Sequence, residues 1–486
     1  MTARQKNTDS GHELTTDEAF EIGMLDAHDQ AALQERGELA PGGLVEAAIL
    51  RIEQIDPQLN VITFTDFDKA RRRARRATGD MAGVPWLLKD GLDYPGMPCR
   101  AGSRSRISAP PGTCSFPYTD RLDSQGLVAL GKANAPEFGL LPTTEPVLYG
   151  PTRNPWARDR SPGGSSGGAA AAVASGMVPL AHAADGGGSI RIPASCCGVI
   201  GLKPGRGSNL RARAPHLIED LIACDVLLSR SARDVAWALH AASPGGDVPA
   251  ERPASGNRRR VALCMDNLWG DAPEPQVRDV IAQTAELCAS LGHDVEERSL
   301  PVDGPAVLKS FQTLWGYLAR DVVALCSAAE NTDLLEPWTR DLAAWSDRLG
   351  VLDMESLVLE TARATAALDA FFADYDLILS PVLRRPALEI GALSPTRAFD
   401  HIMTLMYDYV SYTPLHNLTG FPAISLPVFS GADGVPIGSM FAAARGREDQ
   451  LLGLAGELEA ATSWTDRWPP ISVGALGGKK NQVDGD

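Results

Sequence analysis

The sequence predicts an α/β protein with a parallel or mixed sheet, because helical and strand patterns alternate along most of its 486 residues. Residues 17–56 repeat apolar residues at helical spacing, most regularly in LVEAAILRIEQI at 44–55. Farther along, VALCMD at 261–266, VRDVIAQTAELCASLG at 277–292 and DVEERSL at 294–300 predict a strand, a helix and a second strand. This order is typical of a sheet that is covered by helices.

Shorter segments predict the remaining elements. PWLLKDG at 85–91 predicts a buried strand that runs into a turn, and residues 375–383 and 422–429 predict two more buried strands. Residues 166–174 predict a helix, since their alanines favour helix and the serines and glycines at its start supply capping groups. The proline- and glycine-rich residues 243–257 predict a surface loop.

We expect a single domain over residues 17–473, between a flexible N-terminus at 1–16 and a flexible C-terminal tail at 474–486. The formal net charge of −16 argues against a protein that holds nucleic acid or an anionic membrane surface, because both need a basic face. The one basic run, KARRRARR at 69–76, predicts the solvated face of a helix.

The cysteine spacing and the apolar runs narrow the class of protein further. The eight cysteines form no C-x-x-C pair and no paired Cys/His spacing, so we expect no metal site, and no pattern indicates a cofactor. The N-terminal residues contain no apolar core of a signal peptide, and no apolar run reaches about 18 residues. We therefore expect a cytoplasmic protein with reduced thiols.

Two serine-bearing glycine clusters, GGSSG at 163–167 and DGGGSIRIP at 185–193, flank an alanine-rich run. Glycine at such density is kept where the backbone needs a positive φ or another atom comes very close. GGSSG matches the nucleophile elbow of Ser-His-Asp α/β-hydrolases, with Ser165 as nucleophile, but that motif needs a strand before it and proline-rich YGPTRNPWARDRSP stands there. A non-catalytic anion or nucleotide binder is a second alternative, although the clusters lack the lysine of a phosphate-binding loop.

In the third alternative both clusters form one active site. Ser189 is then the nucleophile, and the amides of the glycines before it form a concavity for a developing oxyanion. A serine needs a base to become a strong nucleophile, and Ser165 can relay the proton to one. Lys89 follows an apolar stretch, where burial would lower its pKa, and is the candidate base.

The residues that carry these features resemble the amidase signature family of serine hydrolases. The similar motifs are GGSSGG, DGGGSIRIP, GVIGLKPGRG and PWLLKDG, with LYGPTRNPW at 148–156 and NLTGFPAISLP at 417–427. The resemblance implies an amidase signature fold, in which helices cover both faces of a mixed central sheet. It also implies an enzyme that hydrolyses the C–N bond of an amide through an acyl-enzyme intermediate.

The resemblance assigns a role to each site residue. Ser189 is the nucleophile, Ser165 shuttles the proton and follows a cis peptide bond, and Lys89 is the base. The implied oxyanion hole consists of the amides of Gly186, Gly187, Gly188 and Ser189.

Neighbouring residues are expected to support this site. Asp185 and Arg191 match charged positions of the signature and are expected to brace the loop. Ser166 either hydrogen-bonds near Lys89 or caps the helix after it. Cys196 and Cys197 are expected to be buried packing residues.

The substrate stays open at this point. The form ADGGGSIR resembles the 6-aminohexanoate cyclic dimer hydrolases, small-amide amidases and urethanases of the family, so the expected substrate is a small amide, linear or cyclic, a carbamate or an ester. The residues that select the substrate are expected in the variable stretch at about 205–410. Four side chains there are expected to pack in the core, with the lining of an acyl pocket as the alternative: Trp315, Tyr317, Cys326 and Trp338. We consider a homodimer as the assembly. The alternative within the family is the amidase subunit of a tRNA-dependent amidotransferase, which needs partner subunits.

Overall fold

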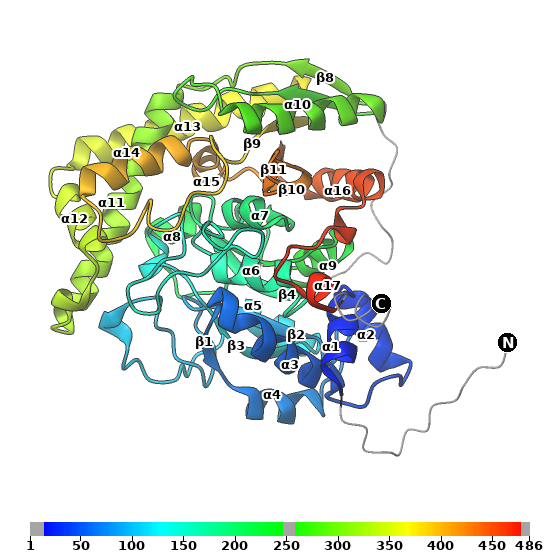
Figure 1. Ribbon diagram of the computed structural model, residues 1–486. Coiled ribbons are helices and arrows are strands. Elements are labelled where there is room, and N and C mark those ends of the chain that lie inside the picture. The colour runs from blue at the N-terminus through cyan, green and yellow to red at the C-terminus, as the bar shows by residue number, and fades with distance from the viewer. Residues whose placement is uncertain (1–13, 246–257, 478–486) are drawn as a thin grey trace.

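The computed structural model of the chain describes residues 14–245 and 258–477 (Figure 1). Most of the predicted loop at 243–257 and most of both predicted flexible ends lie outside the described residues. At the inner boundaries the structure is helical: α1 begins at Thr16, and α17 covers Val473–Gly477. Residues 474–477, which the sequence placed in the tail, are therefore helical, and Gly474 lies directly against the Trp468 ring.

The first sheet has five strands and carries the N-terminal half of the fold. In spatial order they are β1 (Ile62–Thr65), β3 (Val128–Ala133), β2 (Pro85–Lys89), β4 (Leu180–Asp185) and β6 (Cys224–Leu228). The central strand β2 is parallel to β3 and β4, whereas β1 and β6 pair antiparallel at the two edges.

The second sheet has six strands. In spatial order they are β5 (Gly201–Lys203), β10 (Ala423–Ser430), β11 (Pro436–Ala443), β9 (Leu377–Pro381), β7 (Arg260–Leu263) and β8 (Asp294–Glu297). An isolated antiparallel bridge between Ile200 and Ser229 joins the β5 edge to the β6 edge, with the Ile200 amide 2.8 Å from the Ser229 carbonyl oxygen. The prediction of a mixed sheet within an α/β fold is confirmed.

Helices pack on both faces of these strands (Figure 1). Those of the N-terminal half are α1 (Thr16–Gly23), α2 (Ala27–Glu35), α3 (Gly43–Leu59), α4 (Phe67–Ala74), α5 (Pro117–Ser124), α6 (Gly167–Ser175), α7 (Arg191–Cys197), α8 (Leu217–Ile222) and α9 (Ala232–Ala241). Those of the C-terminal half are α10 (Pro275–Ser290), α11 (Gly304–Ala328), α12 (Pro337–Ser346), α13 (Val351–Asp374), α14 (Phe399–Tyr409), α15 (Pro414–Thr419), α16 (Glu448–Thr462) and α17.

The predicted helix over 17–56 is three helices. Asp26 caps the second helix through its side chain, and Gly42 adopts a left-handed φ of 96° before the third, so the chain turns at both places. Residues 69–74 of the basic run lie on α4, whose Ala70 and Ala74 face inward while Arg71 pairs with Glu46 near the surface. The expected solvated helix face is confirmed.

Helix α6 explains the alanine-rich run. All nine of its residues are buried, and it packs against β4 within a core of small and branched apolar side chains. Small side chains let this helix approach the sheet closely, and that places its N-terminal serines beside the strand ends. Within the described residues, no helix is long and apolar enough to cross a membrane.

Candidate active site

Two of the predicted catalytic residues, Lys89 and Ser165, meet at one edge of the first sheet, and Ser189 lies in the turn after the neighbouring strand β4. Lys89 is the last residue of β2 and Asp185 is the last residue of β4. Because these strands are parallel, their carboxyl ends meet at the same edge. Ser165 lies just before α6, and Ser189 lies in the turn between β4 and α7.

Lys89 and Ser165 are in direct contact. Lys89 Nζ lies 2.7 Å from Ser165 Oγ, and both side chains are buried. Burial and, after it, the Arg213 guanidinium lower the pKa of Lys89 to about 7, although the carboxylates of Asp225, Asp185 and Glu219 raise it. A large fraction of this lysine is therefore neutral at neutral pH and able to accept a proton.

The backbone around Ser165 has the predicted form. The Gly164–Ser165 peptide bond is cis. A Cβ at Gly164 would lie 2.7 Å from the backbone nitrogen and oxygen of Thr143, so only glycine fits this close approach. Thr144, which sequence reasoning missed, accepts from the Gly167 amide and donates to the Gly163 carbonyl oxygen at 2.8 Å.

Ser166 hydrogen-bonds near Lys89 and does not cap α6. Its hydroxyl donates to the Ala184 carbonyl oxygen at 3.3 Å and accepts from the Ala184 amide at 3.3 Å. Lys89 Nζ approaches the same carbonyl oxygen at 3.4 Å. Of the two alternatives for Ser166, the structure supports the one beside the lysine.

The glycine turn before Ser189 differs in one respect from the expected oxyanion hole. The Gly188 amide donates to Asp185 Oδ1 at 2.6 Å. This bond uses the single proton of that amide, so the Gly188 amide is not available as a donor to the oxyanion, contrary to the prediction. Gly186, Gly187 and Ser189 keep their amides as candidates. The Ser189 side chain is 7% exposed, and its hydroxyl forms no hydrogen bond with Ser165 in the described part of the chain.

Asp185 and Arg191 brace this turn, as expected. Arg191 Nε lies 2.9 Å from Asp185 Oδ2, and both side chains are fully buried. Although burial opposes ionisation, the Arg191 guanidinium holds the pKa of Asp185 well below its usual range. Asn417 completes the brace, because its amide donates to Asp185 Oδ1 at 2.8 Å and its oxygen accepts from Arg191 at 2.6 Å. The sequence singled out the segment of Asn417 but not this role.

A narrow apolar cavity of about 20 Å³ adjoins Ser189. It is lined by Leu140, Leu141, Pro142, Gly187, Ser189, Ile192, Phe311, Trp315, Met406, Tyr407 and Val410. This volume is room for about one water-sized group, so a longer acyl chain has to displace a wall or extend outward.

Only one of the four candidate acyl-pocket residues lines this cavity. Trp315 does so, and its ring lies 5.0 Å from that of Phe311, which sequence reasoning missed. Trp338 is in the core and donates through Nε1 to the Leu140 carbonyl oxygen. Tyr317 packs partly buried beside that core, and the Cys326 thiol contacts Ser105.

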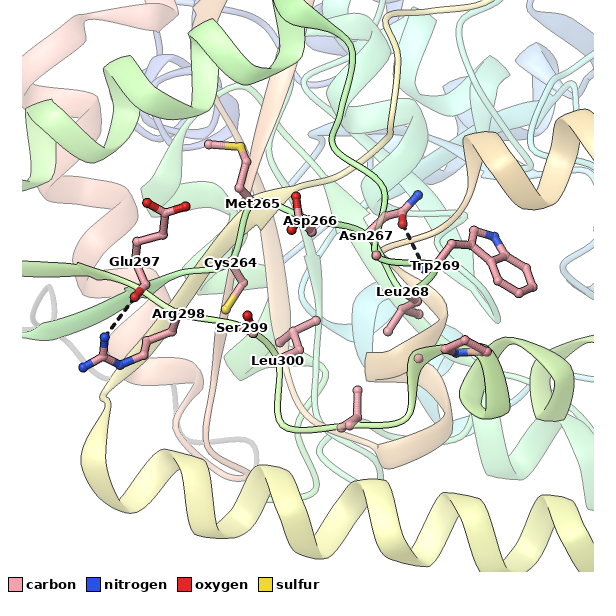
Figure 2. Close-up of a pocket in the computed structure, with 14 residues that line it drawn as sticks. Cys264, Met265, Asp266, Asn267, Leu268, Trp269, Glu297, Arg298, Ser299 and Leu300 are labelled. Atoms are coloured by element: carbon pink, nitrogen blue, oxygen red, sulfur yellow. Dashed lines mark hydrogen bonds between the residues drawn. The ribbon is translucent and has the colours of Figure 1, made fainter.

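A larger cavity, of about 570 Å³, lies away from the predicted residues. Figure 2 shows it beyond the carboxyl ends of β7 and β8, where the Trp269 amide donates to Asn267 Oδ1 and Arg298 donates to the Glu297 carbonyl oxygen. None of the three predicted catalytic side chains lines it. Of the three predicted catalytic residues, Ser189 lines the smaller cavity and none lines the larger one.

Within the described part of the chain, one cluster has the residue types of a metal site: Asp26, His28 and Asp234, with ligand atoms within 4.8 Å of one another. Its oxygens already have partners, since Arg233 pairs with Asp26 and the Ala27 amide donates to Asp234. The donor set is therefore explained by contacts within the chain.

The nucleophile-elbow alternative lacks its structural context. No strand directly precedes Gly163 in the described chain, and Ser165 contacts a lysine instead of a histidine. The buried His182 pairs with Asp225 at 3.0 Å on neighbouring strands β4 and β6. Cys196 and Cys197 are buried, and burial raises the pKa of the Cys196 thiol to about 12, which fits the expected packing role.

Residues 43–452 match the Amidase family model, and the chain belongs to this family, the amidase signature family. It is 36% identical over 456 residues to "Putative amidase AmiC" of Mycobacterium leprae, covering 91% of this chain and 96% of that protein. It is also 36% identical over 494 residues to the 6-aminohexanoate-cyclic-dimer hydrolase of Pseudomonas sp. (strain NK87), covering 92% and 96%.

A solved structure of 6-aminohexanoate cyclic dimer hydrolase complexed with substrate superposes on this fold with a TM-score of 0.85. The sequence identity is 32%, and the match covers 92% of this chain and 99% of the other. The protein is therefore an amidase, an enzyme that hydrolyses amide bonds.

Proposed function

We propose that this enzyme cleaves the C–N bond of a small amide or carbamate through a Ser189–Ser165–Lys89 triad and an acyl-enzyme. The observation that carries the proposal is the 2.7 Å contact between Lys89 Nζ and Ser165 Oγ in a buried site. A neutral amine in that position can take a proton from the serine hydroxyl.

The steps follow from this contact. Ser165 gives its proton to Lys89 and takes the proton of Ser189, whose oxygen attacks the substrate carbonyl carbon. The amides of Gly186, Gly187 and Ser189 stabilise the oxyanion. The proton then returns through Ser165 to the leaving nitrogen, the C–N bond breaks, and an ester to Ser189 remains. Water, activated by the same residues, releases the acid and restores the enzyme.

The substrate class is proposed from the cavity and the relatives. The walls beside Ser189 are apolar and aromatic, which suits an uncharged acyl group. Relatives named for hydrolysis of a cyclic amide dimer support an amide without charges near the scissile bond. A carbamate, as cleaved by a urethanase, offers the same carbonyl and a similar leaving nitrogen, so we include it in the proposed substrate class.

The proposal extends to the setting of the enzyme. We propose a single domain over 17–473, with substrate selection in about 205–410, because Phe311, Trp315 and Tyr407 of that stretch line the cavity. We propose that it acts in the cytoplasm as a homodimer, without nucleic acid or membrane as partner. All eight cysteines are free thiols, which agrees with a reducing compartment.

Covalent labelling tests the nucleophile. A fluorophosphonate is expected to add one adduct to the intact mass of the purified chain, on the peptide that contains Ser189. Ser189→Ala is expected to lose the adduct, whereas Ser195→Ala, a buried serine on α7 that bonds to the Gly438 amide, is the matched control and keeps it. Full labelling of Ser189→Ala would contradict the proposal, and an adduct on Ser165 would favour the elbow alternative.

A hydrolysis panel tests the substrate class and the partner alternative together. The purified chain alone is expected to hydrolyse aliphatic or aryl amides, carbamates or esters that carry an uncharged acyl group. Activity that appears only after a companion subunit is added would favour the amidotransferase alternative.

A further inference from the structure

A group of charged and polar side chains lies beside Lys89, of which His182 and Asp225 are buried and Arg213 is 26% exposed. It consists of Arg213, Asp225 and His182 and is called here the Asp225 cluster. Asp225 is on β6 directly opposite Ala184 of β4, and the carbonyl oxygen of Ala184 is the one that Lys89 Nζ approaches at 3.4 Å. The cluster is thus one strand away from the catalytic amine.

The contacts within the cluster fix its charges. Arg213 Nη2 pairs with Asp225 Oδ2, and His182 Nε2 lies 3.0 Å from Asp225 Oδ1. Although burial opposes ionisation, Arg213 and His182 hold the pKa of Asp225 well below its usual range, so Asp225 is a carboxylate. Burial lowers the pKa of His182, which leaves the ring neutral and its Nε2 hydrogen on the bond to Asp225.

The other charged groups that face Lys89 are Asp185 and Glu219. Asp185 is compensated by Arg191. Glu219, on α8, lies 3.4 Å from Arg213 Nη1 and shares that guanidinium with Asp225. Loss of the Arg213 charge would therefore leave two carboxylates near Lys89 without a compensating positive charge, although Asp225 would keep its bond to the neutral His182 ring.

We propose that Arg213 is a positioning residue that keeps Lys89 unprotonated, by compensating the carboxylates of Asp225 and Glu219. This inference rests on the proposed role of Lys89 as the base. An uncompensated carboxylate near an amine favours its ammonium form, which cannot accept the serine proton. The direction of the Lys89 pKa shift agrees with this role. Burial is the largest cause that lowers this pKa, and the Arg213 guanidinium is the next largest.

The same loop offers a matched control. Arg211 lies two residues before Arg213 and pairs with Asp220 at 2.9 Å, with both side chains well exposed. An exposed ion pair of this kind contributes little to the stability of the fold. Arg211→Gln removes the same charge from the same loop without touching the Asp225 cluster.

The experiment measures kcat/KM against pH for one anilide. In Arg213→Gln the acid limb of this pH profile is expected to move by about one pH unit or more toward alkaline pH, so that kcat/KM at pH 6 falls about tenfold or more. The alkaline plateau of kcat/KM is expected to stay within about threefold of wild type. Arg213→Lys is expected to return the limb toward its original position. Arg211→Gln is expected to leave it unchanged.

A double variant separates charge from packing. Arg213→Gln combined with Asp225→Asn removes both charges, so the acid limb of the pH profile is expected to return most of the way to its wild-type position. A merely structural Arg213 would lower the plateau and the melting temperature in Arg213→Gln, Arg213→Lys and the double variant alike, with the acid limb in place. That result would overturn the proposal.

Lys89→Ala distinguishes failure of this inference from failure of the proposed function. An inactive Lys89→Ala with an unmoved limb in Arg213→Gln would overturn only the role of Arg213. An active Lys89→Ala that keeps the wild-type limb would overturn the role of Lys89 and the inference with it.

Discussion

Lys89 Nζ lies 2.7 Å from Ser165 Oγ, at the point where the carboxyl end of β2 meets the N-terminus of α6. The strand fixes the lysine backbone, the buried helix fixes the serine, and neither element is exposed enough to move freely. In the proposed mechanism Lys89 is the base, and rigid elements of this kind would hold it in place before the substrate binds, which lowers the barrier of the reaction.

The first prediction concerns the titration of Lys89. Because burial lowers its pKa to about 7, kcat/KM for an anilide should rise from pH 6 through about pH 7 as the amine loses its proton, and then level off. Lys89→Ala should abolish anilide hydrolysis and affect an activated ester less, since such a leaving group needs no proton. Lys89→Arg should not restore the anilide reaction, because a guanidinium stays protonated. Near wild-type anilide turnover in Lys89→Arg would reduce Lys89 to a structural residue.

The histidines provide the second prediction. None of the six histidines between residues 182 and 416 hydrogen-bonds to Ser165 or Ser189 in the described chain; they are His182, His216, His240, His293, His401 and His416. Each single change to glutamine should leave kcat within about tenfold, whereas loss of a triad base typically costs about 10⁴-fold. A loss of that size in one histidine variant would contradict the lysine mechanism, provided that its melting curve shows the variant to be folded.

The glycine turn allows a third prediction with an internal control. A Cβ at Gly187 would lie 2.4 Å from Phe311 Cζ, whereas a Cβ at Gly186 would meet Trp315 at an ordinary 3.7 Å. Both alanine variants keep their backbone amides, so they differ only in the cavity. Gly187→Ala should lower kcat/KM by about tenfold or more, because the added methyl group fits only if Phe311, a wall of the cavity beside Ser189, moves. Gly186→Ala should stay close to wild type, and equal losses in the two would show that the cavity does not hold the acyl group.

The brace around Asp185 gives the fourth prediction. Asn417→Ala removes one donor and one acceptor from the buried Asp185–Arg191 pair, whose atoms keep other partners, and it removes the donor to the Ile222 carbonyl oxygen. A buried polar group left unsatisfied costs about 1–3 kcal/mol. The free energy of unfolding in urea should fall accordingly, together with kcat/KM. Asn331→Ala, which loses one 3.4 Å bond to the Ser105 carbonyl oxygen, is the control and should change neither quantity much. Unchanged stability in Asn417→Ala would show that the turn holds without this brace.

The site residues on short motifs could be predicted from the sequence. Glycine patterns around Ser165 and Ser189, and a lysine at the end of an apolar strand, depend on local backbone needs that residue types express directly. The cis peptide bond before Ser165 and the brace by Asp185 and Arg191 were expected only from the resemblance to the amidase signature family. Helix and strand identity also followed, because apolar periodicity records which face is buried.

Other features depended on contacts between distant segments. The Gly188 amide was expected at the oxyanion but donates to Asp185, because the turn closes on its own carboxylate. Phe311 and Tyr407 reach the Ser189 cavity from helices more than 100 residues away, and no local pattern marks such a meeting.

The sequence by itself therefore determined the α/β class and most of the elements, because local spacing and backbone requirements encode them. Its resemblance to the amidase signature family supplied the roles proposed for Lys89, Ser165 and Ser189. Only the tertiary structure decided which amides of the turn are free, which side chains wall the cavity and how Arg213 and Asp225 meet beside Lys89. These features arise where β4 pairs with β6 and where α11 and α14 pack over the turn, and the energies that select such pairings are sums over many contacts between distant residues.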